Sequence, residues 1–339
     1  MRSVPRLLGL LRLGTDVGVR SYPRRMSAVI DYLLQGDPAI RWQVLRDLTD
    51  ASPSEIAAER ARVATEGWGA RMLSLQADDG RWDGGTYRPG WADEGRPFFD
   101  AWTATHFSLQ ALWEYGLDPA SPEARRAVAL VRDNVRWDYN GAPYFDGEVE
   151  PCINGIALGI GAYFGQDVAG IAETIVGQPM ADGGWNCWAE EGSTRGSFHS
   201  TICVIEGLRE WEAATGGTEA SRAARIAGED YLLARGLYRR ASTGEVADPR
   251  MTMLSFPVRW FHDVLRGLDY FRAADRRDPR LSDAIALLRG KADANGMFPY
   301  ENCHEGPRLF AHEQEGEGFP SRWVTLRALR VLRWWEAAA

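Results

Sequence analysis

The feature of this sequence that most constrains its fold is a short turn that recurs along the chain. Residues 76–82 spell Q-x-x-D-G-x-W, and residues 178–185 form a looser copy that ends in Gly-Gly-Trp. Weaker copies, each with a glycine followed by an aromatic residue, stand at 293–298 and 140–145. Such recurrence is typical of a repeat architecture, in which similar units pack side by side.

Each residue type of the turn has a structural role. Glycine adopts the positive φ that ends a helix, and aspartate or asparagine bonds nearby backbone amides. The aromatic side chain fills the joint between neighbouring units. We therefore interpret the turns as structural rather than catalytic.

Two kinds of helical segment alternate around these turns. One kind is apolar around most of its circumference and often opens with Pro or Ser, a helix-start signal. The other is more polar, with one apolar stripe. Helices that are apolar on most sides alternate with helices that have one solvent-exposed face. This alternation predicts an all-α fold, an (α/α)6 toroid (barrel) of alternating inner and outer helices. The predicted inner helices span 38–48, 98–115, 151–164, 197–211, 257–271 and 320–335, and the outer ones 26–35, 53–76, 122–136, 167–177, 219–236 and 279–292.

Composition excludes several classes of function. The net charge of −8 disfavours nonspecific binding to nucleic acid or anionic membranes. No apolar run approaches the roughly 20 residues of a membrane span. The four cysteines among 339 residues are too few for a disulfide scaffold, which favours a reduced, cytoplasmic protein.

Residues 1–25 differ from the rest of the chain. They carry six arginines against one acid, and Arg12 interrupts the stretch that would form a signal-peptide core. We expect a disordered tail, or an upstream start codon with Met26 as the working start. No internal boundary follows, so residues 26–339 are expected to form a single domain.

The turns and the helices that follow them resemble the repeats of squalene and terpenoid cyclases and the β-subunits of protein prenyltransferases, over about residues 28–336. The resemblance implies an isoprenoid or other apolar substrate in a central cavity. The D-x-D-D acid motif of class II cyclases is missing, since Gln76 stands in its first position in Gln76-Ala77-Asp78-Asp79. A prenyltransferase-like activity is therefore favoured over protonation-initiated cyclisation. Protein prenyltransferases use a separate α-subunit, and whether this chain has such a partner stays open.

The same resemblance implies a zinc site. Protein prenyltransferases hold zinc with Asp-x-Cys before one inner helix and a histidine at the start of a following one. Here Glu150 and Cys152 match the first pair and His199 the second, with Glu in place of Asp and Asp146 as a fallback. Carboxylate, thiolate and imidazole suit Zn²⁺ and leave a fourth position open. The alternative is a small core cysteine and an ordinary hydrogen-bonded histidine.

Cys303 and His304 form a second candidate metal site. They lie in the loop 299–319 before the last inner helix, with Cys187 as the remaining partner. The arrangement resembles the zinc site of lanthionine-forming cyclases, which are also helical toroids. The spacing departs from that pattern by one residue.

Further residues near the expected helix starts are candidates for catalysis and substrate binding. Arginines beside helix N-termini suit a diphosphate or carboxylate, and aromatic side chains suit an apolar substrate or a carbocation. The alternative is that they form salt bridges and core. The candidate acid–base residues are Asp100, His106, His262 and Asp263, and the candidate substrate contacts are Trp102, Phe198, Arg259, Trp260, Arg322 and Trp323.

Two rival functions remain open. A carbohydrate-active (α/α)6 enzyme needs carboxylates spaced across a cleft, for which Asp93, Glu94, Asp100 and Glu301 are available. A toroid that serves as a non-catalytic scaffold or binding protein needs none of these groups, because a fold alone does not determine function.

Overall fold

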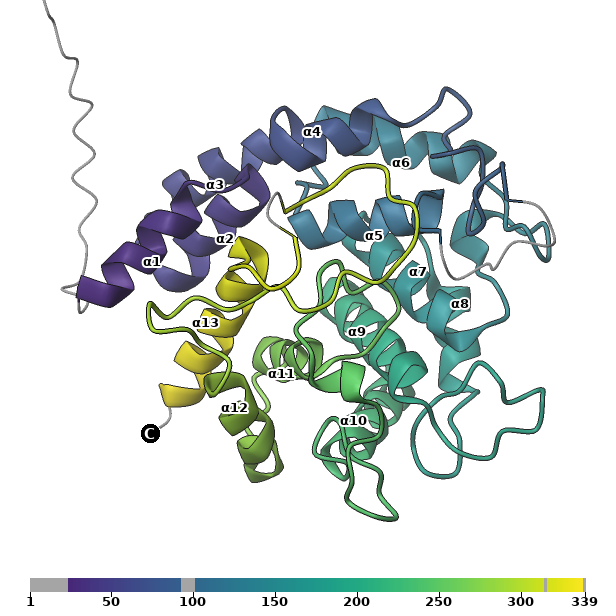
Figure 1. The fold of residues 1–339 in the computed structure, drawn as a ribbon. Helices are drawn as coiled ribbons and strands as arrows, with labels where there is room; N and C mark the ends of the chain where they lie inside the picture. The colour runs from purple at the N-terminus through teal and green to yellow at the C-terminus, as the bar shows by residue number, and fades with distance from the viewer. Residues whose placement is uncertain (1–23, 93–100, 314–315, 338–339) are drawn as a thin grey trace, which may run out of the picture.

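The computed structural model describes residues 24–92, 101–313 and 316–337, and this part of the chain is built of helices. Apart from isolated bridges, the described residues form no β-structure. The predicted all-α class is confirmed (Figure 1). None of the helices in these ranges is long and apolar enough to cross a membrane. Residues 1–23, most of the predicted tail, lie outside the described residues.

Six helices of the described chain bury most of their apolar residues and are called the buried set. The best example is the helix at 151–163, in which every residue from Pro151 to Ala162 is buried. Its small residues allow close packing against the next buried helix, at 198–215. The buried set comprises α2 (Pro38–Leu48), α5 (Thr105–Tyr115), α7 (Pro151–Tyr163), α9 (Phe198–Thr215), α11 (Val264–Ala273) and α13 (Arg322–Glu336).

The remaining helices cover the buried set and bury one side each. In the helix at 122–134, for example, only Ala124, Ala127, Val128 and Val131 are buried, at the spacing of one helix face. The covering set comprises α1 (Arg24–Leu34), α3 (Pro53–Ala61), α4 (Gly67–Ser74), α6 (Pro122–Asn134), α8 (Ala169–Val176), α10 (Glu219–Leu233) and α12 (Ser282–Arg289), with short 3₁₀ turns η1 (Arg62–Ala64), η3 (Tyr144–Asp146), η4 (Pro249–Thr252) and η5 (Pro279–Leu281).

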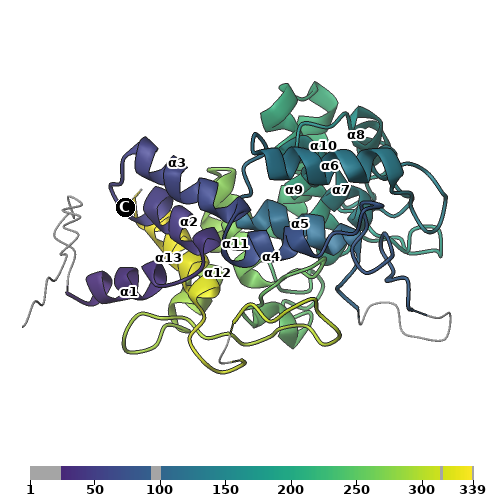
Figure 2. The same cartoon turned by 90° about the horizontal axis from the view of Figure 1, so that it is seen from above.

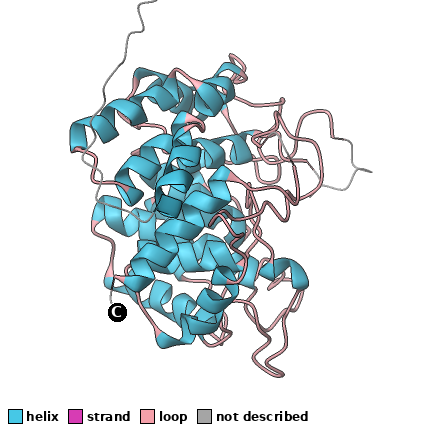
Figure 3. Cartoon of the chain, turned by 60° about the vertical axis from the view of Figure 1, so that its left-hand side comes forward, coloured by secondary structure: helices cyan, strands magenta, loops and turns pink. Residues whose placement is uncertain are grey.

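Helices pack against partners both near and far in the sequence. α7 contacts α5 and α9, α13 contacts α11 and α2, and α4 contacts both α2 and α5. α1 also contacts α13, so the first and last helices of the described chain lie side by side (Figures 1 and 2). The long loops gather on one side of the helices (Figure 3).

The recurring turn has the same backbone in three copies. Gly80, Gly183 and Gly296 have φ of 85°, 85° and 84°. The aromatic residue that follows, Trp82 or Trp185, is fully buried, and its indole donates to a carbonyl at the end of the preceding helix. These contacts agree with the structural role that the sequence predicts.

Each turn is also tied to the next buried helix through a threonine that the sequence pattern did not reveal. The backbone amides of the three buried aromatic residues donate to threonine hydroxyls in α5, α9 and α13. The pairs are Trp82 with Thr105 at 3.2 Å, Trp185 with Thr201 at 3.0 Å, and Phe298 with Thr325 at 2.9 Å.

The predicted start of the helix at 257–271 is wrong. α11 begins at Val264, because Arg259 has a φ of 55°, which a right-handed helix does not allow. Asp263 caps the helix instead, its carboxylate accepting from the amide of Arg266 at 2.9 Å. Trp260 and His262 therefore lie in a loop.

Two further predicted boundaries are wrong. In the described part of 98–115 the helix begins only at Thr105. Trp102, before it, is held by a distant segment, since its amide donates to the carbonyl of Pro307 at 3.0 Å. The segment 53–76 is not one helix, because Gly67 has a φ of 62° and separates α3 and η1 from α4.

Candidate functional site

A pocket of about 450 Å³ lies where α7 and α9 begin. Its walls combine aromatic rings with groups that can bind a metal. Trp188, at its edge, is 65% exposed, whereas Cys152 is buried. The lining residues are Tyr87, Glu150, Cys152, Asn186, Cys187, Trp188, Ser197, His199, Ser200 and Trp260.

A carboxylate and two thiols meet in this pocket. The ligand atoms of Glu150, Cys152 and Cys187 all lie within 4.8 Å of one another, the single such group of three in the part of the chain described. The Cys152 thiol donates to Glu150 Oε2 at 3.6 Å. Ser200, in the first turn of α9, fixes Cys187 by contacting its backbone amide and its Sγ, each at 3.3 Å.

The surroundings of this group favour a cation. Burial raises the pKa of the Glu150 carboxyl. The pKa of the Cys152 thiol is raised well above its usual value by its contact with Cys187 and by burial. The charged residues that act most strongly on Glu150, Glu148 and Glu191, are acidic. Two thiols and a carboxyl in acidic surroundings have the donor chemistry that suits Zn²⁺.

His199 lines the same pocket but lies outside the group of three. Its Nδ1 accepts a hydrogen bond from the backbone amide of His262 at 2.8 Å. The lone pair of Nδ1 is thus in use, and the neutral ring carries its proton on Nε2. Burial and Arg266 lower the pKa of His199 to about 4. The ring therefore offers a hydrogen-bond donor rather than a metal ligand.

The other candidate acid–base residues with described positions, His106, His262 and Asp263, do not line this pocket. His262 Nε2 donates to the carbonyl of Leu237 at 2.7 Å, and its ring stacks on Phe198. His106 Nδ1 is 3.0 Å from the hydroxyl of Tyr144. Burial lowers the pKa of both imidazoles to about 3. Both therefore stay neutral in the interior, and Asp100 lies outside the described residues.

Arg259 is buried, only 4% exposed, near the loop that carries Trp260. Within the described ranges its guanidinium makes no hydrogen bond or ion pair, and it lies 5.7 Å from the ring of Trp102. Burial lowers its pKa to about 10. Arg322, by contrast, is engaged with Tyr32, donating to its carbonyl at 3.0 Å and stacking on its ring.

The second candidate metal residues do not form a group of three ligands with any other part of the described chain. Cys303 Sγ is 3.3 Å from a nitrogen of Arg308. The His304 ring stacks on Phe261 with 3.9 Å between centroids. Cys187, the partner expected for them, belongs instead to the pocket at α7 and α9.

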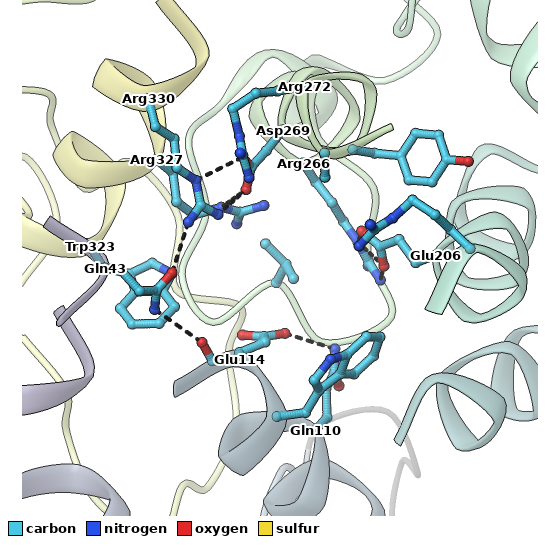
Figure 4. Close-up of a pocket in the computed structure, with 15 residues that line it drawn as sticks. Gln43, Gln110, Glu114, Glu206, Arg266, Asp269, Arg272, Trp323, Arg327 and Arg330 are labelled. Atoms are coloured by element: carbon cyan, nitrogen blue, oxygen red, sulfur yellow. Dashed lines mark hydrogen bonds and ion pairs between the residues drawn. The ribbon is translucent and has the colours of Figure 1, made fainter. Parts of the chain in front are cut away.

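A separate cavity lies between α2, α5, α9, α11 and α13 (Figure 4). The resemblance implies an apolar central cavity, but this one is lined by five arginines and three carboxyl groups as well as Trp113 and Trp323. The aromatic-lined pocket is the one at the N-terminal ends of α7 and α9. Neither pocket shares a lining residue with the other.

No protein-family model matches the chain. No curated protein matches it either. A solved structure of a protein from Actinoplanes is similar to 92% of this chain and 99% of its own, with 14% sequence identity and a TM-score of 0.47.

Proposed function

We propose that the chain is a zinc-dependent, prenyltransferase-like transferase that acts on an isoprenoid or other apolar substrate. The observation that carries the proposal is the convergence of Glu150, Cys152 and Cys187 on the wall of an aromatic-lined pocket. These three groups would hold the metal. Bound zinc would stabilise a substrate thiol as its thiolate or lower the pKa of a bound water.

The other pocket residues have roles in binding and orientation. Trp260, Trp188 and Tyr87 offer aromatic surface to an apolar chain. His199 offers its Nε2 proton to a polar group of the substrate. Ser200 keeps Cys187 in place through two contacts. Arg259 precedes Trp260 in the sequence but does not line this pocket, so it has no role in the proposed binding.

The proposal includes the toroid. Support comes from the contacts of α13 with α1 and α2, which link the two ends of the described chain, and from the contacts of α7 with α5 and α9 between them. Five helices of the buried set also line one cavity. A toroid brings the N-terminal ends of its inner helices to one mouth, as required for residues of α7 and α9 to share a pocket.

We place this activity in the cytoplasm. The four cysteines are free, and two of them serve the proposed metal site. Thiol ligands of this kind need a reducing compartment.

Metal analysis of the purified protein tests the zinc site. We expect one zinc per chain, lost in Cys152→Ser and in Cys187→Ser. Cys303→Ser is the matched control and keeps the metal, since its thiol lies outside the group. His199→Ala also keeps it, because Nε2 is protonated. Stoichiometric zinc in both of the first two variants would exclude the site.

Calorimetry with geranyl diphosphate tests the substrate class. We expect saturable binding that Trp260→Ala weakens at least tenfold, because the ring forms part of the pocket wall. Trp334→Ala is the control, since Trp334 lies at the end of α13, away from this pocket. Binding that is equal in both variants would contradict the placement of the substrate.

A carbohydrate-active enzyme receives less support. Such an enzyme needs two carboxyl groups free to act across a cleft. Of the carboxyl groups named for this role, Glu301 is held by Lys291 at 2.7 Å, and Asp93, Glu94 and Asp100 lie outside the described residues. In the cavity between α2, α5, α9, α11 and α13, Glu206 and Asp269 form ion pairs with arginines. Glu114 is the one remaining carboxyl group among its lining residues.

A further inference from the structure

The cavity between α2, α5, α9, α11 and α13 holds more positive than negative groups. Arg266 is paired with Glu206 at 2.6 Å. Asp269 pairs with three further arginines that line the cavity, namely Arg272, Arg327 and Arg330. Asp47 adds a second carboxylate, 3.5 Å from Arg330. Two carboxylates shared among three guanidinium groups leave an uncompensated positive charge at the cavity wall.

Several hydrogen-bond donors at this wall lack a partner. Arg327 is only 8% exposed, and its Nε donates to Asp269 at 3.0 Å. Neither of its Nη atoms has a partner within the described ranges. The Nε of Arg209 and the Nε1 of Trp323 are also buried and unpaired. Guanidinium nitrogens that have no protein acceptor at a cavity wall favour an anion there.

The opposite wall in Figure 4 carries Gln110 and Glu114. Gln110 Nε2 donates to Glu114 Oε1 at 3.0 Å, while Gln110 Oε1 is buried without a partner. Burial raises the pKa of the Glu114 carboxyl. The Glu114 carboxylate interacts with Arg327 and Arg266 and therefore opposes the binding of an anion beside them.

The geometry points to a binding site for a small organic carboxylate in this cavity. Its acidic group binds the free nitrogens of Arg327, and its flat apolar body lies between Trp113 and Trp323. The cavity volume of about 160 Å³ is close to that of an engineered cavity of about 150 Å³ that takes up benzene. A single six-membered ring with one carboxylate therefore fits.

This site is independent of the proposed zinc site. The two pockets have no residue in common. On α9, Glu206 follows His199 by seven residues, which is about 10 Å along a helix axis. Ligands of the two sites would not compete for the same groups.

Calorimetry with benzoate and benzamide tests the proposal. The two probes share a shape and differ in charge. We expect benzoate to bind at one site per chain and benzamide to bind at least tenfold more weakly. Equal affinities, or no benzoate binding, would refute a carboxylate site.

Variants locate the binding. Arg327→Gln is expected to weaken benzoate binding at least tenfold, and Arg132→Gln, on the surface of α6, leaves it unchanged. Glu114→Gln keeps the hydrogen bond with Gln110 and removes a negative charge, so benzoate should bind more tightly. Unchanged or weaker binding in Glu114→Gln would overturn the proposal even where Arg327→Gln fails to fold. Cys152→Ser should still bind benzoate, which separates this site from the metal site.

Discussion

Asp269 is the residue on which the packing of α11 and α13 depends most directly. Its carboxylate accepts from Arg272 at 2.7 Å, from Arg327 at 3.0 Å, and from Arg330 at 2.8 Å. Burial alone would raise its pKa, but the three arginines hold the pKa well below the usual range. The side chain is thus a buried anion that cations surround.

Replacing Asp269 with asparagine should destabilise the protein strongly. Loss of the anion removes the nearest carboxylate of three guanidinium groups, of which only Arg330 keeps another, Asp47 at 3.5 Å, within the described ranges. Removing one partner of a buried ion pair typically costs about 3–5 kcal/mol. Urea denaturation at neutral pH measures the effect. Asp133→Asn is the control, since Asp133 pairs with Arg132 on the surface and should change stability little. A variant as stable as the parent would show that solvent screens the cluster.

His106 should make the protein sensitive to mild acid. Burial lowers its pKa to about 3 in the folded protein, whereas the unfolded chain protonates near 6.5. Below that value the unfolded state binds the extra proton, so stability falls as the pH falls. This residue alone should cost about 1.4 kcal/mol between pH 7.5 and pH 5.5.

Urea denaturation of the parent and of His106→Gln at both pH values measures this loss. The variant should lose less stability on acidification than the parent, whatever its absolute stability. An equal loss in the two proteins would show that His106 binds its proton as readily in the folded state as in the unfolded state.

The sequence predicts some residues of the candidate site but not how all of them are used. The resemblance to protein prenyltransferases implies Glu150 and Cys152 as metal ligands, and both line the pocket. Cys187 is expected beside Cys303 and His304, but it lies in the pocket where α7 and α9 begin. It follows the buried turn residue Trp185 by two positions, which places it there. Which nitrogen of His199 faces the pocket depends on the backbone of His262, 63 residues away, and no local pattern reveals such a contact.

Helices α7 and α9 pack with their backbones in close contact, and glycines at the contact allow this approach. A Cβ at Gly207 would lie 2.1 Å from the carbonyl oxygen of Gly155, and one at Gly155 would lie 2.6 Å from the backbone of Cys203. Backbone atoms cannot yield as a flexible side chain can. The approach of the two helices, and with it the meeting of Cys152 and Cys187, therefore requires both glycines.

Gly207→Ala should separate the two helices and cost about 1–3 kcal/mol or more, as overpacking of a core does. Gly170→Ala is the matched control. This glycine lies in α8 with no atom within 4 Å of an added Cβ, so alanine there should stabilise by roughly 0.5–1 kcal/mol through its helix propensity. Urea denaturation of both variants measures the two opposite changes. A neutral effect of Gly207→Ala would mean that the contact between α7 and α9 is looser than 2.1 Å implies.

The sequence predicts the start of a helix correctly where the helix-start residues and the tertiary contacts favour the same position. The helices at 151–163 and 198–215 begin within one residue of the predicted starts. The helix α11 was predicted seven residues too early, because apolar spacing continues through Trp260 and Phe261. The contact of His262 with Leu237 and the left-handed backbone of Arg259 hold that segment in a loop. Both depend on residues that lie next to it only in the folded chain.

At the scale of the whole molecule, the two ends of the described chain stabilise each other. Arg330 in α13 donates to Gln43 Oε1 in α2 at 2.8 Å, and Arg333 donates to the carbonyl of Asp47 at 2.9 Å. Tyr32 in α1 donates to the carbonyl of Pro320 at 3.0 Å. An open array of repeats would contact only its neighbours in sequence, whereas a ring couples its first and last units.

Hydrogen exchange on Arg330→Met distinguishes a ring from an open array. In a ring, loss of this arginine should speed amide exchange at least tenfold in α1 and α2, some 290 residues away, as well as in α13. Exchange in α7 and α8 should change much less, because those helices lie on the far side of the contact network. Arg132→Met on α6, whose arginine pairs only with Asp133 on the surface, serves as the control and should leave α1 and α2 unchanged. Faster exchange confined to α11 and α13 would show that the ends do not support each other, and the proposed toroid would have to be replaced by an open arrangement of the same helices.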